Sequence, residues 1–207
     1  MKTSHNFFSN LAFNLAESHI GKTGTNPSVG CVVVKNNSVI STGITSINGR
    51  PHAEINALNK LSKNKINNKT VMYISLEPCF KNNSCCAKAI ANAGIKKVFI
   101  SSLDPNPNIK GKGIKFLKQQ NIKVIHSSKS LDKFQKINKY FYTHQTLNRP
   151  FITLKIAISK NGFSKSPTIK NITSEQTQYF MHRMRLSHDA IAVGMNTLLD
   201  DKPKLTC

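Results

Sequence analysis

The sequence predicts an α/β fold in which helices cover a mixed β-sheet. Segments with apolar residues at helical spacing alternate with short β-branched runs, and Gly, Pro and Asn punctuate the changes. The 207 residues, 39% of them hydrophobic, suffice for a real core. No apolar run approaches the ~20 residues of a membrane span, and the first residues lack the apolar stretch of a secretion signal. We therefore expect a cytoplasmic protein.

The N-terminal part of the chain predicts a helix followed by a β-hairpin. Residues 8–18 carry apolar side chains at helical spacing, and a loop over 21–27 follows. Residues 29–35 read as a strand, and Asn36-Asn37 forms a hairpin-type turn into a second strand over 38–43.

Further along, helix and strand patterns alternate, which favours a sandwich with a mixed sheet. The predicted helices cover residues 53–61, 87–93, 113–120 and 131–143, and Gly94 is the expected C-cap of the second of them. The predicted strands cover residues 71–76, 97–101 and 122–125.

A boundary is predicted at Asn148-Arg149-Pro150. Beyond it we expect a strand over 151–157, a loop over 160–170, a helix over 174–186 and a strand over 190–194. A unit of this length is too short to bury a core of its own. We therefore expect two domains, 1–147 and an incomplete 148–207.

The formal net charge of +21 could mark a nucleic-acid binder. The lysines are scattered, however, and alternate with Asn and Ile, as in residues 63–69. AT-rich codons explain all three residue types. We expect only weak, salt-sensitive association with polyanions. Five cysteines, an odd number, favour a reducing compartment over a disulfide framework.

Three segments carry the chemistry: Pro51-His52-Ala53-Glu54, Glu77-Pro78-Cys79, and Cys86. They supply one imidazole, two thiols and one free carboxylate. Zinc takes such ligands tetrahedrally, and a catalytic site keeps its fourth position open for water. Glu54 lies near enough to His52 to handle protons without being a ligand. The pattern is the signature of zinc nucleobase deaminases. We expect Glu77 to orient its loop, and the other six histidines, His144 included, to be surface or packing residues.

The chain resembles the bifunctional riboflavin-biosynthesis deaminase/reductase family from about residue 10 to its last residue. In the first part, the stretches that carry the resemblance are residues 26–35, 49–54, 75–79, 93–95, and Asp104-Pro105-Asn106-Pro107 with Gly111-Lys112-Gly113. In the second part, they are residues 149–151, 154–159, 172–174 and 197–206. The resemblance implies a cytidine-deaminase-like three-layer α/β/α sandwich, followed by the first β-α-β part of a reductase domain.

The resemblance also implies the chemistry. Zinc held by His52, Cys79 and Cys86 would activate water against 2,5-diamino-6-ribosylamino-4(3H)-pyrimidinone 5′-phosphate, with Glu54 moving protons and Asn26 binding this small-molecule substrate. In the reductase part, the implied substrate contacts are Arg185 and Leu205, and the implied NADPH contacts are Ile158, Thr197 and Asp201. The dinucleotide-binding core would come later, so we expect no reductase activity from these residues. Deaminases of this type commonly associate, which allows a homo-oligomer.

The chain departs from the family pattern at several positions. The stretch between Cys79 and Cys86 is short and lacks a histidine that the family has, and Thr45 stands where a substrate-contacting histidine is usual. Either Cys85 or Cys86 could be the third ligand, and spacing to Ala89 and Gly94 favours Cys86. A tRNA or nucleoside deaminase, and a non-catalytic zinc-stabilised binding module, are the alternative functions.

Overall fold

The structure is a computed structural model that describes residues 2–62, 65–81, 85–126, 131–165, 168 and 171–206. The chain divides into two compact units, Met1–Phe151 and Ile152–Cys207. No described helix is long and apolar enough to cross a membrane.

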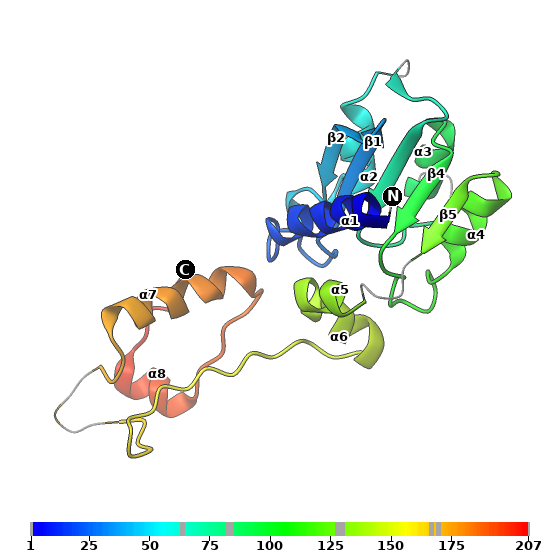
Figure 1. The fold of residues 1–207 in the computed structure, drawn as a ribbon. Helices are drawn as coiled ribbons and strands as arrows, with labels where there is room; N and C mark the ends of the chain where they lie inside the picture. The colour runs from blue at the N-terminus through cyan, green and yellow to red at the C-terminus, as the bar shows by residue number, and fades with distance from the viewer. Residues whose placement is uncertain are drawn as a thin grey trace. The chain divides into compact units, whose positions relative to one another are not determined.

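The first unit is built on a mixed sheet with the strand order β2-β1-β3-β4-β5 (Figure 1). Its strands are β1 (Gly30–Lys35), β2 (Ser38–Ile44), β3 (Thr70–Ile74), β4 (Lys97–Ile100) and β5 (Lys123–His126). The β1 strand pairs antiparallel with β2 and β3, and the β3, β4 and β5 strands run parallel. The predicted mixed sheet is therefore confirmed, and each strand begins within one residue of its predicted start.

Helices cover both faces of this sheet. Helix α1 (Lys2–Glu17) packs on the face that carries Val32, Val34 and Tyr73. The opposite face is covered by α2 (Ala53–Asn59), α3 (Cys86–Asn92) and α4 (Lys112–Gln119), and β-strand residues such as Val33, Met72 and Val98 point into the larger core there. A short 3-10 turn, η1 (Ile47–Gly49), precedes α2.

Glycine makes the close approach of α2 to the sheet possible. A Cβ atom on Gly43 of β2 would lie 2.0 Å from the Ala53 main-chain oxygen and 2.5 Å from the Ala57 nitrogen. Real Cβ atoms do not approach backbone atoms so closely, because such a contact is strongly repulsive. Helix α2 therefore lies directly on β2, and its N-terminal end is fixed in place.

The predicted helix over 131–143 is two helices, α5 (Leu131–Ile137) and α6 (Lys139–Leu147). The break lies at Asn138, whose φ of −116° and ψ of 38° are not helical. Ser28 N donates to Asn138 Oδ1 at 2.6 Å, and Asn138 Nδ2 donates to Ser28 O at 3.0 Å. This tertiary contact fixes Asn138 outside helical geometry, which hydrophobic spacing could not reveal.

The second unit contains α7 (Glu175–Met184), η4 (Arg185–Ser187) and α8 (Met195–Asp201). Helix α7 confirms the predicted helix, and the Thr177 amide donates to the Ser174 hydroxyl at its N-cap. Helix α8 was not predicted. The predicted loop over 160–170 lies partly outside the described residues.

The predicted strands over 151–157 and 190–194 are wrong, because the residues described there form no hydrogen bonds to a sheet. A strand is completed only by a partner strand. The apolar side chains of the first segment remain exposed, as in Leu154 at 80% and Ile152 at 72%. No described residue of 152–206 is buried, so this unit has no core of its own.

Candidate metal and catalytic site

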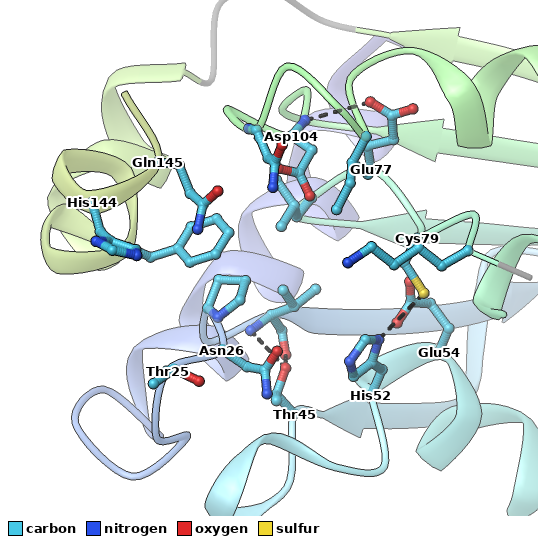
Figure 2. Close-up of a pocket in the computed structure, with 17 residues that line it drawn as sticks. Thr25, Asn26, Thr45, His52, Glu54, Glu77, Cys79, Asp104, His144 and Gln145 are labelled. Atoms are coloured by element: carbon cyan, nitrogen blue, oxygen red, sulfur yellow. Dashed lines mark hydrogen bonds between the residues drawn. The ribbon is translucent and has the colours of Figure 1, made fainter. Parts of the chain in front are cut away.

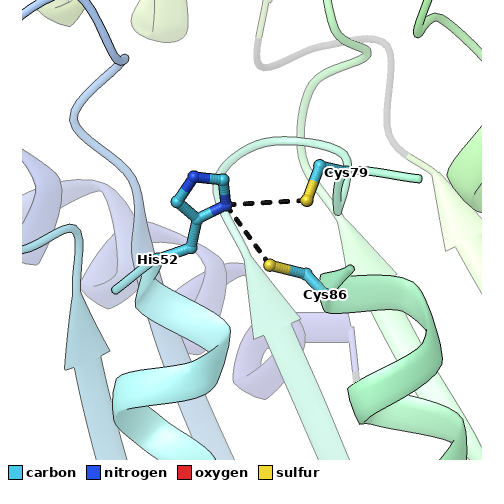
Figure 3. Close-up of side chains that lie close together, drawn as sticks. All are labelled: His52, Cys79 and Cys86. Carbon is cyan, nitrogen blue, oxygen red and sulfur yellow. Dashed lines mark hydrogen bonds between the residues drawn. The ribbon is translucent and has the colours of Figure 1, made fainter. Parts of the chain in front are cut away.

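One imidazole and two thiols meet beside the end of β3 (Figure 3). His52 is the residue before α2, Cys79 follows β3, and Cys86 is the first residue of α3. His52 Nδ1 lies 3.3 Å from Cys86 Sγ and 3.6 Å from Cys79 Sγ. The three potential ligand atoms all lie within 4.8 Å of one another. Nitrogen and thiolate donors in such a group fit the coordination preference of Zn²⁺.

The protonation of this cluster also suits a cation. A hydrogen bond with Cys86, and a further one with His52, lower the pKa of the Cys79 thiol to about 4. The contact with Cys79 raises the pKa of His52 and that of Cys86. Ionisation of the Cys79 thiol therefore opposes ionisation of the neighbouring Cys86 thiol. A divalent cation would favour ionisation of both thiols, because it binds both as thiolates.

Cys85 does not belong to this cluster, although it is adjacent to Cys86 in the chain. It is the N-cap residue of α3 and is only 7% exposed. The structure thus groups Cys86, rather than Cys85, with His52 and Cys79. The short stretch between Cys79 and Cys86 includes residues 82–84, which lie outside the described residues.

Glu54 lies beside the cluster in the first turn of α2. Its carboxyl is buried at 3% exposure, and burial raises its pKa to about 7. The side chain also interacts with Cys86. A carboxyl with a pKa near the working pH can both accept and return a proton. Glu54 is held in this position because α2 lies directly against β2, and the absence of a side chain at Gly43 allows that close approach.

A pocket of about 480 Å³ opens above Glu54, with His52 and Cys79 in its wall (Figure 2). Asn26 and Thr45 lie on one side of it. Gly49, at φ +89°, lies behind Asn26, since a Cβ there would come 2.2 Å from Asn26 Nδ2. The Val29 amide donates to the Thr45 hydroxyl at 3.0 Å, which fixes that side chain.

Two other segments complete the pocket wall. The loop after β4 contributes Asp104, Asn106 and Ile109, and burial raises the pKa of Asp104 to about 6. Helix α6 contributes Phe141, His144 and Gln145, whose contribution the sequence analysis missed. His144 is exposed, as predicted, but it also lines the pocket. No motif or spacing in the sequence indicates that α6 lines the pocket, because the position of this helix depends on the Asn138–Ser28 contact.

The second unit brings together two of its predicted site residues. Arg185 Nη1 donates to the main-chain oxygens of Lys204 at 3.3 Å and Thr206 at 2.8 Å, on either side of Leu205. Thr197 and Asp201 lie on α8, and Ile158 is 60% exposed in the extended segment. Their roles remain predictions.

The fold and the cluster define a zinc-binding region of the cytidine-deaminase type. The family model of the cytidine and deoxycytidylate deaminase zinc-binding region matches residues 2–102, and that of the RibD C-terminal domain matches residues 150–207. Over nearly its whole length, the chain is similar to the RibD family of riboflavin biosynthesis proteins.

Individual relatives agree with this assignment. The riboflavin biosynthesis protein RibD of Aquifex aeolicus is 38% identical over 200 residues, which are 95% of this chain and 55% of that protein. Acinetobacter baumannii RibD has a TM-score of 0.88 at 30% identity, over 97% of this chain and 56% of that structure.

The Thermotoga maritima diaminohydroxyphosphoribosylaminopyrimidine deaminase/5-amino-6-(5-phosphoribosylamino)uracil reductase has a TM-score of 0.83 at 32% identity, over 99% of this chain and 59% of that structure. The chain thus spans about half the length of the relatives that it matches.

Proposed function

We propose that residues 1–147 form a zinc-dependent pyrimidine deaminase of riboflavin biosynthesis. The observation that carries the proposal is the buried Glu54 carboxylate, placed beside the His52, Cys79 and Cys86 cluster where the pocket opens. A structural zinc site is closed by four protein ligands, whereas a catalytic site has three and an open position. Among the described residues the cluster has three members.

In the proposed reaction, water adds to the amine-bearing ring carbon and the carbon–nitrogen bond then breaks to release ammonia. Zinc, when bound, would supply a Lewis acid that makes water acidic near neutral pH. Glu54 would accept one proton from the water and pass it to the ring nitrogen. It would then take the second proton from the added hydroxyl and deliver it to the departing amine, as the carbonyl forms. Its burial favours this role, because a pKa of about 7 permits both steps.

The proposed substrate is 2,5-diamino-6-ribosylamino-4(3H)-pyrimidinone 5′-phosphate. Asn26 would hydrogen-bond the pyrimidine, since its side chain lines the pocket on the side facing His52. Lys81 and Asn106 also line the pocket and offer a cation and an amide to the ribosyl phosphate. The activity for which the Thermotoga relative is named supports this substrate class.

We propose further that residues 148–207 are the N-terminal part of an NADPH-dependent reductase domain. The match of the RibD C-terminal domain to residues 150–207 supports this assignment. Arg185 and Leu205 would contact substrate, and Ile158, Thr197 and Asp201 would contact NADPH.

The deciding experiment measures ammonia release by the zinc-loaded protein with the diaminopyrimidinone ribosyl phosphate, cytidine and tRNA as substrates. We expect turnover of the first alone. Turnover of tRNA or cytidine alone would replace the proposal with a tRNA or nucleoside deaminase. No turnover of any substrate despite one bound zinc per chain would indicate a non-catalytic zinc module.

The Glu54→Gln variant tests the mechanism separately. The amide has the size of the carboxylate but cannot accept the proton, so we expect kcat to fall about 10²–10⁴-fold with zinc content unchanged. Unchanged activity in this variant would exclude the role given to Glu54.

A further inference from the structure

The Glu77 carboxylate is bound by four main-chain amides from a distant part of the chain. The side chain is only 3% exposed. Its Oε2 atom accepts from Asp104 N at 3.4 Å and Gly111 N at 2.9 Å, and its Oε1 atom accepts from Gly113 N at 3.1 Å and Ile114 N at 3.3 Å. An ionised carboxylate is acceptor-only, which matches four donors. All four donors belong to the loop after β4 and the first turn of α4.

The main chain around Glu77 is held equally closely. Glu77 N donates to Ser102 O at 2.8 Å, at the end of β4. A Cβ atom on Gly113 would lie 2.1 Å from Pro78 O, so the start of α4 lies directly on this carbonyl. Side chain and main chain thus hold the same two segments together.

These two segments form different parts of the candidate site. Residues 104–109 supply one wall of the pocket through Asp104, Asn106 and Ile109. Cys79, two residues after Glu77, belongs to the metal cluster. A single carboxylate therefore links the pocket wall to the metal-ligand turn, although it belongs to neither the cluster nor the proton-transfer path.

We propose that Glu77 is a positioning residue of this site. Its carboxylate fixes the spacing between the 104–111 loop and the Cys79 turn, and so holds a bound substrate at the depth where its amine-bearing carbon meets the water. This inference rests on the proposed deaminase function, because it concerns the reaction at the same site.

The Glu77→Gln variant tests the inference. The amide keeps the shape but replaces one acceptor oxygen with an NH₂ group that faces two N–H donors. We expect KM to rise about tenfold or more, while kcat and zinc content stay within about threefold. Amide hydrogen exchange at Gly111 and Gly113, followed by NMR, should accelerate by about tenfold or more.

Tyr73→Phe is the matched control. It removes the hydrogen bond of 2.7 Å between the Tyr73 hydroxyl and His5 Nδ1, on the opposite face of the sheet. We expect it to lower stability without changing KM or exchange at Gly111. If Glu77→Gln behaves in the same way, Glu77 is only structural and the inference is overturned.

Two further results separate the inference from its premises. If Glu77→Gln does not fold, Glu77→Asp keeps the charge on a shorter side chain and should give an intermediate rise in KM. An unchanged KM in folded Glu77→Asp would overturn the inference. If the parent protein releases no ammonia, the proposed function fails, whereas exchange at Gly111 and Gly113 still decides whether Glu77 holds the loop.

Discussion

The side-chain amide of Asn138 and the main chain of Ser28 bond in both directions, at 2.6 Å and 3.0 Å, and both residues are buried. This pair ties the start of α6 to the segment that leads from Asn26 into β1. It therefore joins two walls of the pocket whose residues are far apart in sequence.

Removal of this contact should damage both stability and the pocket. Asn138→Ala leaves one buried donor and one buried acceptor at Ser28 without partners, at about 1–3 kcal/mol each. We expect a loss of about 2–5 kcal/mol in the free energy of unfolding, measured by urea denaturation, and a higher KM. Asn14→Ala, at an exposed position of α1, is the control and should change neither.

The two adjacent cysteines should differ sharply in zinc binding. Cys86→Ser removes a member of the cluster, and we expect the purified protein to lose most of its zinc, as measured by elemental analysis. Cys85→Ser should retain one zinc per chain, because Cys85 lies outside the cluster. Loss of zinc from the Cys85 variant alone would reverse the assignment.

The contribution of Asp104 to the free energy of unfolding should decrease as the pH rises from about 4 to 6. Burial, with a smaller contribution from the charges of Glu77 and Cys79, raises its pKa from 3.8 to about 6, although the Asn106 amide and Lys81 oppose the shift. The folded state thus binds this proton more tightly than the unfolded state between about pH 4 and 6, so its contribution is lost as pH rises through that window.

The Asp104→Asn variant tests this contribution. Its amide oxygen can still accept from Asn106 N, but it does not titrate. Relative to the parent, we expect the zinc-free variant to gain stability progressively from pH 4 to 6, by at most about 2–3 kcal/mol. Urea denaturation across this range measures the difference, and a difference that does not change with pH would contradict the shift.

A methyl group at Gly43 should displace α2. Gly43→Ala places a Cβ 2.0 Å from the Ala53 oxygen, and we expect a loss of about 1–3 kcal/mol or more, with weaker zinc retention because His52 precedes the displaced helix. Gly194→Ala is the matched control. Nothing lies within 4 Å of its added Cβ, and its φ of −66° suits alanine. Because Gly194 is the N-cap of α8, where alanine is less favourable than glycine, we expect at most a small loss of stability. Thermal unfolding of both variants compares them.

The sequence predicted those parts of the molecule that depend on local patterns. Residues 29–35 formed a strand because a buried β-branched run fits a central sheet position. His52, Cys79 and Cys86 meet because each lies at the start of a helix or the end of a strand, where the fold brings such ends together.

Features that depend on distant contacts could not be predicted in this way. The break at Asn138 requires Ser28, and the four amides around Glu77 come from the 104–114 segment. Residues 151–157 carry a strand pattern but join no sheet among the described residues. Pattern alone thus predicted the residues that meet in the cluster, but not all of the pocket walls around them.

Helix α6 lies outside residues 2–102, the part of the chain that matches the zinc-binding region. Reactive groups and part of the enclosing wall are therefore encoded in separate stretches of sequence. Under the proposed function, substitutions at His144 or Gln145 should change which pyrimidine fits while leaving proton transfer by Glu54 unchanged. Substrate selectivity can therefore be changed, by natural or designed substitutions in α6, without altering the residues of the metal cluster.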